Sequence, residues 1–269
     1  MKPPFAYYGG KTTLAPQIAT ALPEHDHYVE PFAGSLAVLL AKEPSSMETV
    51  NDLDEKLMTF WRVLRDQPEA LERACRLTPH SRTELALAQE DTDDELEAAR
   101  RVWVTLTQSR SHRLTDIGWK FRKQANHNSM PSGMRTFTNR MESVAERIHN
   151  VSLENRDALD VIRDYGTEPT VCIYADPPYL GETRSGTYRL EMKSAEQHET
   201  FAEACHAAKA AVVVSGYDSD LYTNLFAGWH RTDLIAPTAL SGATNRVETL
   251  WSNRPLNITI QHDLFGGAA

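Results

Sequence analysis

The sequence predicts an α/β fold in which a doubly wound, mostly parallel sheet carries a mainly helical insertion. Short apolar segments alternate with helical segments of about ten residues near both ends of the chain, which is the pattern of parallel strand–helix–strand units. Between residues 56 and 150 this alternation stops and helical periodicity takes over. At 269 residues the chain is long enough for one large domain with a substantial insertion.

The expected strands are short and fall into two groups, one on each side of the insertion. They cover residues 28–32, 48–52, 151–154, 171–175 and 211–215, and 230–235 and 247–251 add an antiparallel end to the sheet. Helices are expected over 36–42, 55–65, 69–76, 82–90, 94–107, 135–148, 158–165, 195–208 and 218–226, and a polar loop over 109–133. We therefore divide the chain into a sheet domain, 1–55 and 151–269, and an insertion, 56–150.

The composition is that of a globular protein, with 41% hydrophobic and 24% charged residues. No segment approaches the roughly 18–20 apolar residues of a membrane span, and the N-terminus lacks the apolar stretch of a signal peptide. We therefore expect a cytoplasmic protein that does not bind membranes. Cys75, Cys172 and Cys205 are far apart and the ten histidines show no ligand spacing, so we expect buried thiols and no metal.

The charge is distributed unevenly along the chain. The net charge is −9, yet residues 100–150 hold ten basic residues against three acids, a local charge of +7. Trp103, Trp119, Phe121 and Phe137 lie among these charges. An acidic protein with one basic region suits local binding of phosphates, although solvated helix faces would give the same count.

Two segments with polar or glycine residues follow the first two expected strands. Residues 29–35 form a strand that ends in a glycine turn at Gly34, where a helix begins and a ligand can approach the backbone. Asp52 comes 18 residues later, close to the spacing at which an acid binds a ribose hydroxyl in dinucleotide-type folds. Asp52 is the better candidate for this role, and Asp54 for the N-cap of the next helix.

The sharpest signal is the segment of residues 175–179, Ala-Asp-Pro-Pro-Tyr, directly after a buried strand. Two prolines hold the backbone extended and remove amide donors, so carbonyl oxygens dominate the local polarity. Asp176 and Tyr179 flank them. A planar ligand with an amino group would find hydrogen-bond acceptors at its edge and an aromatic ring for stacking.

The order of these motifs resembles that of the Dam-like DNA adenine-N6 methyltransferases. It runs from residues 7–11 (Tyr-Tyr-Gly-Gly-Lys) through 30–34 (Glu-Pro-Phe-Ala-Gly) and 51–52 to 176–179, and covers roughly residues 1–60 and 150–255. The resemblance implies S-adenosylmethionine as cofactor, a Rossmann-like methyltransferase sheet, and a target-recognition insertion. It implies a partner, double-stranded DNA, and a function, methyl transfer to N6 of an adenine that has left the duplex.

The resemblance also implies roles for individual residues. The cofactor-binding residues would be Tyr7, Gly9, Gly10, Lys11, Glu30, Phe32, Gly34, Asp52 and Asp176. The catalytic residues would be Asp176, Pro177, Pro178 and Tyr179. Two positions depart from the family, which usually has Trp where Tyr7 stands and often has Gly where Leu36 stands.

Adenine N6 is a poor nucleophile because its lone pair is conjugated with the ring. Hydrogen bonds from the amino group to the Asp176 carboxylate and the Pro177 carbonyl would localise that lone pair, so catalysis rests on positioning and electrostatics. Tyr179 would stack on the extruded base.

The basic insertion supplies candidate DNA contacts, which are Arg110, Arg113, Lys120, Arg122, Lys123 and Arg135. The loop 241–246 is a weaker candidate for DNA contact. The loop 181–192 could close over the extruded base, touch phosphate or be simply solvated, and residues 215–217 could border the base pocket or form a plain strand-end turn. The recognition sequence, the oligomeric state and any partner nuclease are not predicted. Cytosine N4 or RNA adenine as acceptor, and a non-catalytic DNA-binding protein, remain alternatives.

Overall fold

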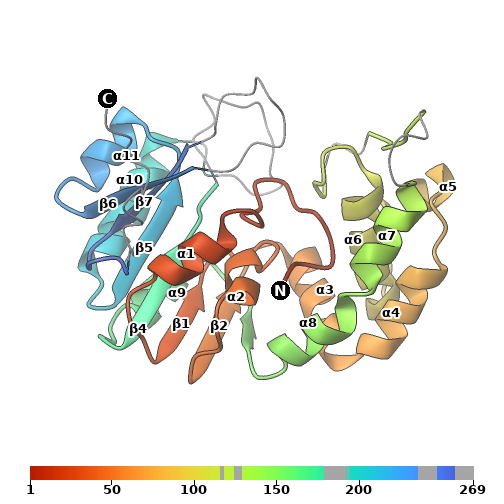
Figure 1. Cartoon of the computed structure of the whole chain (residues 1–269), viewed down its shortest axis with the longest axis horizontal. Helices are drawn as coiled ribbons and strands as arrows, with labels where there is room; N and C mark the ends of the chain where they lie inside the picture. Colours follow the sequence, from red (N-terminus) through yellow and green to blue (C-terminus); the bar gives the residue numbers. More distant parts are fainter. Residues whose placement is uncertain (116–117, 124–128, 179–191, 193, 236–246, 258–269) are drawn as a thin grey trace, which may run out of the picture.

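The computed structural model describes residues 1–115, 118–123, 129–178, 192, 194–235 and 247–257. In this part of the chain a seven-stranded sheet lies beside a group of helices formed by the insertion (Figure 1). The strands are β1 (His27–Glu30), β2 (Met47–Asn51), β3 (Ser152–Glu154), β4 (Val171–Ala175), β5 (Ala211–Gly216), β6 (His230–Ile235) and β7 (Val247–Ser252). Their order is β3-β2-β1-β4-β5-β7-β6. The first five are parallel and β7 is antiparallel to both its neighbours, which confirms the predicted sheet.

Helices cover both faces of this sheet (Figure 1). One face packs against α1 (Ala15–Ala21) and α2 (Ala37–Ala41), and the other against α9 (Ala158–Tyr165), α10 (Ala195–Ala207) and α11 (Asp220–Leu225). Neighbouring strand residues divide between the two cores: Tyr28 belongs to the first and Val29 to the second. Because successive side chains of a strand point to opposite faces, both faces of the sheet are buried, as in a doubly wound fold.

The sequence analysis missed α1, a short helix that starts with Pro16 in its first turn. The helices that were predicted are all present, but one prediction in the insertion is wrong. The single helix expected over 135–148 is two helices, α7 (Met130–Thr138) and α8 (Met141–Ile148). The first of them begins inside the predicted loop, because Ser129 caps it and Pro131 occupies its first turn.

The remaining insertion helices are α3 (Glu55–Asp66), α4 (Pro68–Leu77), α5 (Arg82–Leu87) and α6 (Glu95–Gln108). They hold the N-terminal segment of the chain against the sheet. The indole of Trp103 donates a hydrogen bond to the Pro4 carbonyl at 3.0 Å, and Trp61 packs on Phe5 with ring centroids 5.2 Å apart. The buried core is therefore continuous from the sheet into the insertion, and the division into domains stays a prediction.

All three cysteines are buried, as predicted. Among the described helices, none has the length and apolar character needed to cross a membrane.

Candidate active site and cofactor pocket

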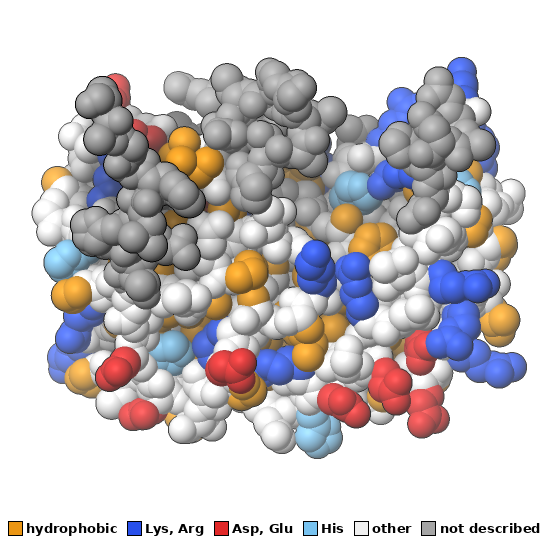
Figure 2. Space-filling view, viewed as in Figure 1, with side chains coloured by type: hydrophobic (Ala, Val, Ile, Leu, Met, Phe, Trp, Pro, Cys, Tyr) orange, Lys and Arg blue, Asp and Glu red, His pale blue; other side chains and the backbone are white. Residues whose placement is uncertain are grey.

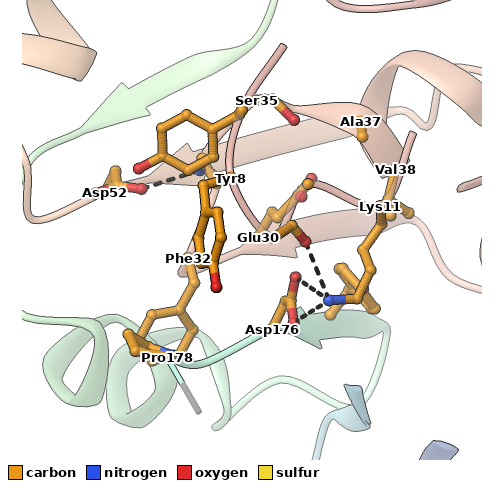
Figure 3. A pocket seen from close by; sticks show the side chains of 16 residues that line it. Tyr8, Lys11, Glu30, Phe32, Ser35, Ala37, Val38, Asp52, Asp176 and Pro178 are labelled. Atoms are coloured by element: carbon orange, nitrogen blue, oxygen red, sulfur yellow. Dashed lines mark hydrogen bonds and ion pairs between the residues drawn. The ribbon is translucent and has the colours of Figure 1, made fainter. Parts of the chain in front are cut away.

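A cavity opens at the carboxyl ends of β1, β2 and β4, where the strand order changes direction. This is the place where open α/β sheets bind ligands. The space between its lining atoms is about 610 Å³, including the part open to solvent. All nine residues predicted to bind the cofactor line it (Figure 3). The topology thus brings together four motifs that are far apart in the sequence.

Asp52 joins two of the loops around this cavity. Its Oδ2 accepts a hydrogen bond from the Gly34 amide at 2.9 Å, and its Oδ1 accepts one from the Asp54 amide at 2.9 Å. Asp54 in turn caps α3 through the amides of Lys56 and Leu57, as predicted. Asp52 therefore lies at the pocket rim with its position fixed by backbone donors.

The backbone of the glycine turn is left-handed at two residues, Gly34 (φ +48°) and Leu36 (φ +56°). A Cβ at Gly34 would lie 3.2 Å from the Tyr7 ring, so glycine is needed there for both conformation and space. Leu36 stands where the family often has glycine, and its conformation gives the physical reason for that preference. The fully buried side chain of Leu36 packs in the main core, which offsets the strain.

Lys11 and Asp176 form a short ion pair inside the pocket (Figure 3). The Lys11 ammonium lies 2.7 Å from Oδ1 and 2.8 Å from Oδ2 of Asp176. Burial disfavours the charge on Lys11, but the carboxylates of Asp176 and Glu248 outweigh it and raise the pKa of Lys11 above its ordinary value. Lys11 therefore stays charged at physiological pH.

A hydroxyl network supports Asp176 from the neighbouring strand. The Ser215 hydroxyl, near the end of β5, donates to Asp176 Oδ1 at 3.1 Å. The Tyr174 hydroxyl lies 2.9 Å from that of Ser215. Because Ser215 and Tyr174 are buried in the sheet, they fix the direction of the Asp176 carboxylate.

Glu30 is the second acid that faces the pocket from the sheet, and it is almost fully buried. Burial raises its pKa to about 8, although a hydrogen bond from the Tyr28 hydroxyl acts in the opposite direction. At neutral pH the Glu30 side chain is therefore mostly a neutral carboxylic acid, unlike a typical surface glutamate.

The structure places the predicted catalytic segment only in part. Pro178 lines the cavity together with Asp176, whereas Pro177 does not contribute to the lining. Tyr179, the loop 241–246 and all of the loop 181–192 except Met192 lie outside the described residues.

Sequence reasoning missed several residues of the site, namely Tyr8, Ser35, Tyr174 and Glu248. Tyr8 lies inside the motif of residues 7–11 without having been assigned a role, Ser35 directly follows that of residues 30–34, and Tyr174 immediately precedes the Ala175–Asp176 step. Glu248 could have been noticed in the sequence, because it is the one charged residue of strand β7, whose other residues are apolar or uncharged. Ser215 had been considered only as one possible border of the pocket.

The six predicted DNA contacts lie on the insertion, where Lys and Arg side chains gather at the right of Figure 2. Four of them are exposed, which are Arg110, Arg122, Lys123 and Arg135. The other two are half-buried: the Arg113 guanidinium lies 3.7 Å from the centre of the Tyr8 ring, and the Lys120 ammonium lies 2.9 Å from His112 Nε2. The charge count overstated the basic surface, because ion pairs hold Arg100, Arg101 and Arg147.

Comparison with known proteins identifies the family. The sequence model of the D12 class N6 adenine-specific DNA methyltransferases matches residues 7–240. The chain belongs to this family. A relative of this methyltransferase is the Type II methyltransferase M1.LlaDCHI of Lactococcus lactis subsp. cremoris. It is 27% identical over 209 residues, which are 70% of this chain and 69% of the relative.

Solved structures with a similar arrangement of strands and helices match this chain with low TM-scores. The precorrin 8w decarboxylase of Methanobacterium thermoautotrophicum has 8% identity and a TM-score of 0.41, covering 94% of this chain and 98% of the other. The SAM-dependent methyltransferase of Agrobacterium tumefaciens has 11% identity and a TM-score of 0.38, covering 90% and 61%. Neither likeness bears on what this methyltransferase binds.

The enzyme therefore transfers a methyl group to N6 of adenine in DNA, and its cofactor is S-adenosylmethionine. This confirms the main sequence prediction over cytosine N4 and RNA adenine as acceptors. The pocket residues fit the cofactor, because aromatic rings, glycine backbone and the Asp52 carboxylate surround one cavity. A Cβ at Gly10 would lie 3.0 Å from the Tyr7 carbonyl, so the chain at Gly10 lies too close to Tyr7 to carry a side chain without a shift. No cluster of three metal-ligating side chains occurs among the described residues.

Proposed function

We propose that the cavity at the carboxyl ends of β1, β2 and β4 binds S-adenosylmethionine and that Asp176 receives the amino group of the target adenine. The observation that supports this most strongly is the half-buried carboxylate of Asp176 at the cavity wall, held by Lys11 and Ser215. The carboxylate is therefore already oriented before the substrate binds.

The cofactor would be held by the loops that Asp52 joins. S-adenosylmethionine, when bound, supplies an electrophilic methyl group on a positively charged sulfur. Tyr7 and Phe32 offer apolar faces for its adenine, and Asp52 offers a carboxylate for its ribose hydroxyls. Gly34 leaves its backbone accessible at this point because no side chain covers it.

The target adenine would place its amino group between two acceptors. The Asp176 carboxylate and the carbonyl oxygen of Pro177 would each accept one hydrogen bond from N6, which localises the nitrogen lone pair toward the methyl carbon. The new bond between N6 and the methyl carbon would form as the bond between that carbon and the sulfur breaks, so N6 would carry a positive charge until it loses a proton. The negative charge of Asp176 would stabilise N6 in that state. Positioning the two reactants in line supplies the rest of the rate enhancement.

We also propose that the DNA is double-stranded and that the target base leaves the helix to reach the pocket. The four exposed basic residues Arg110, Arg122, Lys123 and Arg135 would bind phosphates, with some contacts to base edges. Arg113 and Lys120 would act mostly through their contacts with Tyr8 and His112, since their charged groups are engaged there. Tyr179 would stack on the extruded adenine, an interaction worth about 1–3 kcal/mol.

The proposal is tested by replacing Asp176. The purified enzyme is incubated with S-adenosylmethionine and unmethylated duplex DNA, and the DNA is digested to nucleosides for mass spectrometry. We expect N6-methyladenine from the wild type, none from Asp176→Ala, and wild-type amounts from Asp218→Asn. Asp218 is a matched control, because it is an exposed acid just after β5 that pairs with Arg231.

Calorimetry separates binding from chemistry in the same variants. Asp176→Ala should still bind the cofactor, whereas Asp52→Ala should lose most of its affinity for it. Full methylation by Asp176→Ala would contradict the catalytic role, and unchanged cofactor affinity in Asp52→Ala would leave Asp52 only its structural role of joining the two loops.

A further inference from the structure

Glu248 is a buried acid on β7, the antiparallel strand between β5 and β6. Its carboxylate lies 3.4 Å from the Lys11 ammonium, on a strand outside the four motifs and beyond the residues 7–240 that the family model matches. Side chains of both partners are only 6% exposed. Burying a carboxylate is costly unless it is paired, so Glu248 needs a cationic partner such as Lys11 at this position.

Lys11 thus lies between two carboxylates at unequal distances. It is 2.7–2.8 Å from both oxygens of Asp176 and 3.4 Å from Glu248. Oδ1 of Asp176 also accepts a hydrogen bond from the Ser215 hydroxyl. Of the roughly four lone-pair sites of the carboxylate, Lys11 and Ser215 use two on Oδ1 and Lys11 uses one on Oδ2. The site left for the adenine amino group is therefore on Oδ2, directly beside the Lys11 ammonium.

An adenine amino group that binds Oδ2 would place a second donor beside the Lys11 ammonium. This crowding favours a shift of Lys11 away from Asp176. A displacement of the ammonium by about 0.6 Å toward Glu248 would bring that pair to the usual 2.8 Å of a charged hydrogen bond. Lys11 would remain charged and paired throughout, because its contact with Glu248 shortens as its contacts with Asp176 lengthen, and no buried charge is left alone.

We propose that Glu248 is a positioning residue that takes up Lys11 when the target adenine binds to Asp176. This proposal rests on the proposed role of Asp176. Glu248 touches neither substrate nor cofactor in it, and acts through Lys11 alone. No covalent bond is made or broken in the exchange, and no proton is transferred.

The test is Glu248→Gln, which keeps the shape of the side chain and removes its charge. Lys11 should then stay on Asp176 and compete with the adenine amino group. We expect the single-turnover rate of methyl transfer to fall about 10- to 100-fold, the range of a charged hydrogen bond, with little change in the dissociation constants of cofactor and DNA. Asp233→Asn should keep the wild-type rate, because Asp233 is exposed on the adjacent strand β6, where it pairs with Thr249.

Two further variants separate positioning from a purely structural role. Glu248→Asp keeps the charge and should retain more of the rate than Glu248→Gln. In the background of Lys11→Met, Glu248→Gln should cost no further rate, because its only route of action is gone. Equal rates for Glu248→Asp and Glu248→Gln, or independent losses in the double variant, would overturn the proposal.

The proposal and the assignment of Asp176 can fail separately. A wild-type rate in Glu248→Gln, with Asp176→Ala inactive, would overturn only the role of Glu248. Activity in Asp176→Ala would overturn both. Should Glu248→Gln fail to fold, Glu248→Ala is compared in the wild-type and Lys11→Met backgrounds: a loss of single-turnover rate only where Lys11 is present supports the proposal, and no loss, or an equal loss in both backgrounds, contradicts it.

Discussion

Two lysine–carboxylate pairs are buried at opposite ends of the same sheet. Lys11 pairs with Asp176 at the carboxyl ends of the parallel strands, and Lys42 pairs with Glu48 near the start of β2. Both pairs have a distance of 2.7 Å, and both lysine side chains are 6% exposed. By distance and burial of the lysine they are indistinguishable.

The surroundings of the two carboxylates differ. Glu48 is enclosed by protein donors, since it also accepts from both terminal nitrogens of Arg147 and from the Ser45 amide. Asp176 faces a cavity, is 19% exposed, and shares its lysine with Glu248. A carboxylate whose partners are all fixed stabilises the fold, whereas one that faces a cavity and shares a cation is available for chemistry.

The largest expected effect is on the rate of methyl transfer when Lys11 is replaced. Lys11→Met should lower the single-turnover rate about 100-fold, because Asp176 loses two charged hydrogen bonds that set its position. Lys42→Met should keep that rate within about twofold, since distant sites act independently, while it destabilises the fold. Similar rate losses in both variants, measured with saturating DNA below their melting temperatures, would remove the distinction between the pairs.

The second-largest effect is expected on stability, when the pair of Lys42 and Glu48 is broken. Glu48→Gln should lower the free energy of unfolding by about 3 kcal/mol at pH 7, because Lys42 and Arg147 would lose their buried counter-charge. Urea unfolding measures this difference. An unfolding free energy equal to that of the wild type would show that the pair is not structural.

Glu48 should also make the stability of the fold depend on pH. Burial acts to raise the pKa of Glu48, but the hydrogen bonds from Arg147 and Lys42 outweigh it and hold the pKa below the ordinary 4.5. The stability from Glu48 is therefore present above about pH 4.5 and is lost as the pH falls below it. Glu48→Gln should lack this part of the acid sensitivity.

Glu30 should give a pH dependence of opposite sign. Its pKa is raised from 4.5 to about 8, with burial as the main cause. The folded protein keeps a proton that the unfolded chain loses, so stability falls as the pH rises from about 4.5 to about 8. Melting temperatures between pH 5 and pH 8 should fall less steeply for Glu30→Gln than for the wild type. Parallel profiles would show that Glu30 is ionised in the fold.

The smallest effect is expected on DNA affinity when a basic residue of the insertion is replaced. The side chains proposed to bind DNA are exposed there, unlike the two buried ion pairs. Lys123→Ala should weaken DNA binding several-fold and reduce the slope of log affinity against log salt concentration by about one. Arg163→Ala on α9 is the control, since Arg163 is an exposed cation outside the insertion. Unchanged affinity and slope in Lys123→Ala would remove Lys123 from the proposed DNA surface.

The sheet and most of the pocket were predictable because local signals determine them. Strand and helix periods gave the strand positions and the antiparallel end, and the motif order placed Asp52 and Asp176 at one edge of the sheet. The break between α7 and α8 was missed, because an apolar period continues across Asn139 and Arg140.

The rest depends on contacts between distant residues. No local pattern shows that Glu248 lies 3.4 Å from Lys11, because a strand from the far end of the chain carries it there. The pairing of Arg147 with Glu48 is hidden for the same reason. Counting charges along the sequence therefore overestimated the basic surface and underestimated the ion pairs of the core.

The most direct test of the account measures two properties of Asp176→Asn and Glu48→Gln side by side. These are the single-turnover rate of N6-methyladenine formation with saturating DNA, and the midpoint of urea unfolding. We expect Asp176→Asn to lose the rate and keep its midpoint close to that of the wild type, since Lys11 retains Glu248 as a partner. Glu48→Gln should do the reverse. A full rate in Asp176→Asn, or losses of rate and stability that accompany each other in both variants, would contradict the assignment of chemistry to the Asp176 end of the sheet.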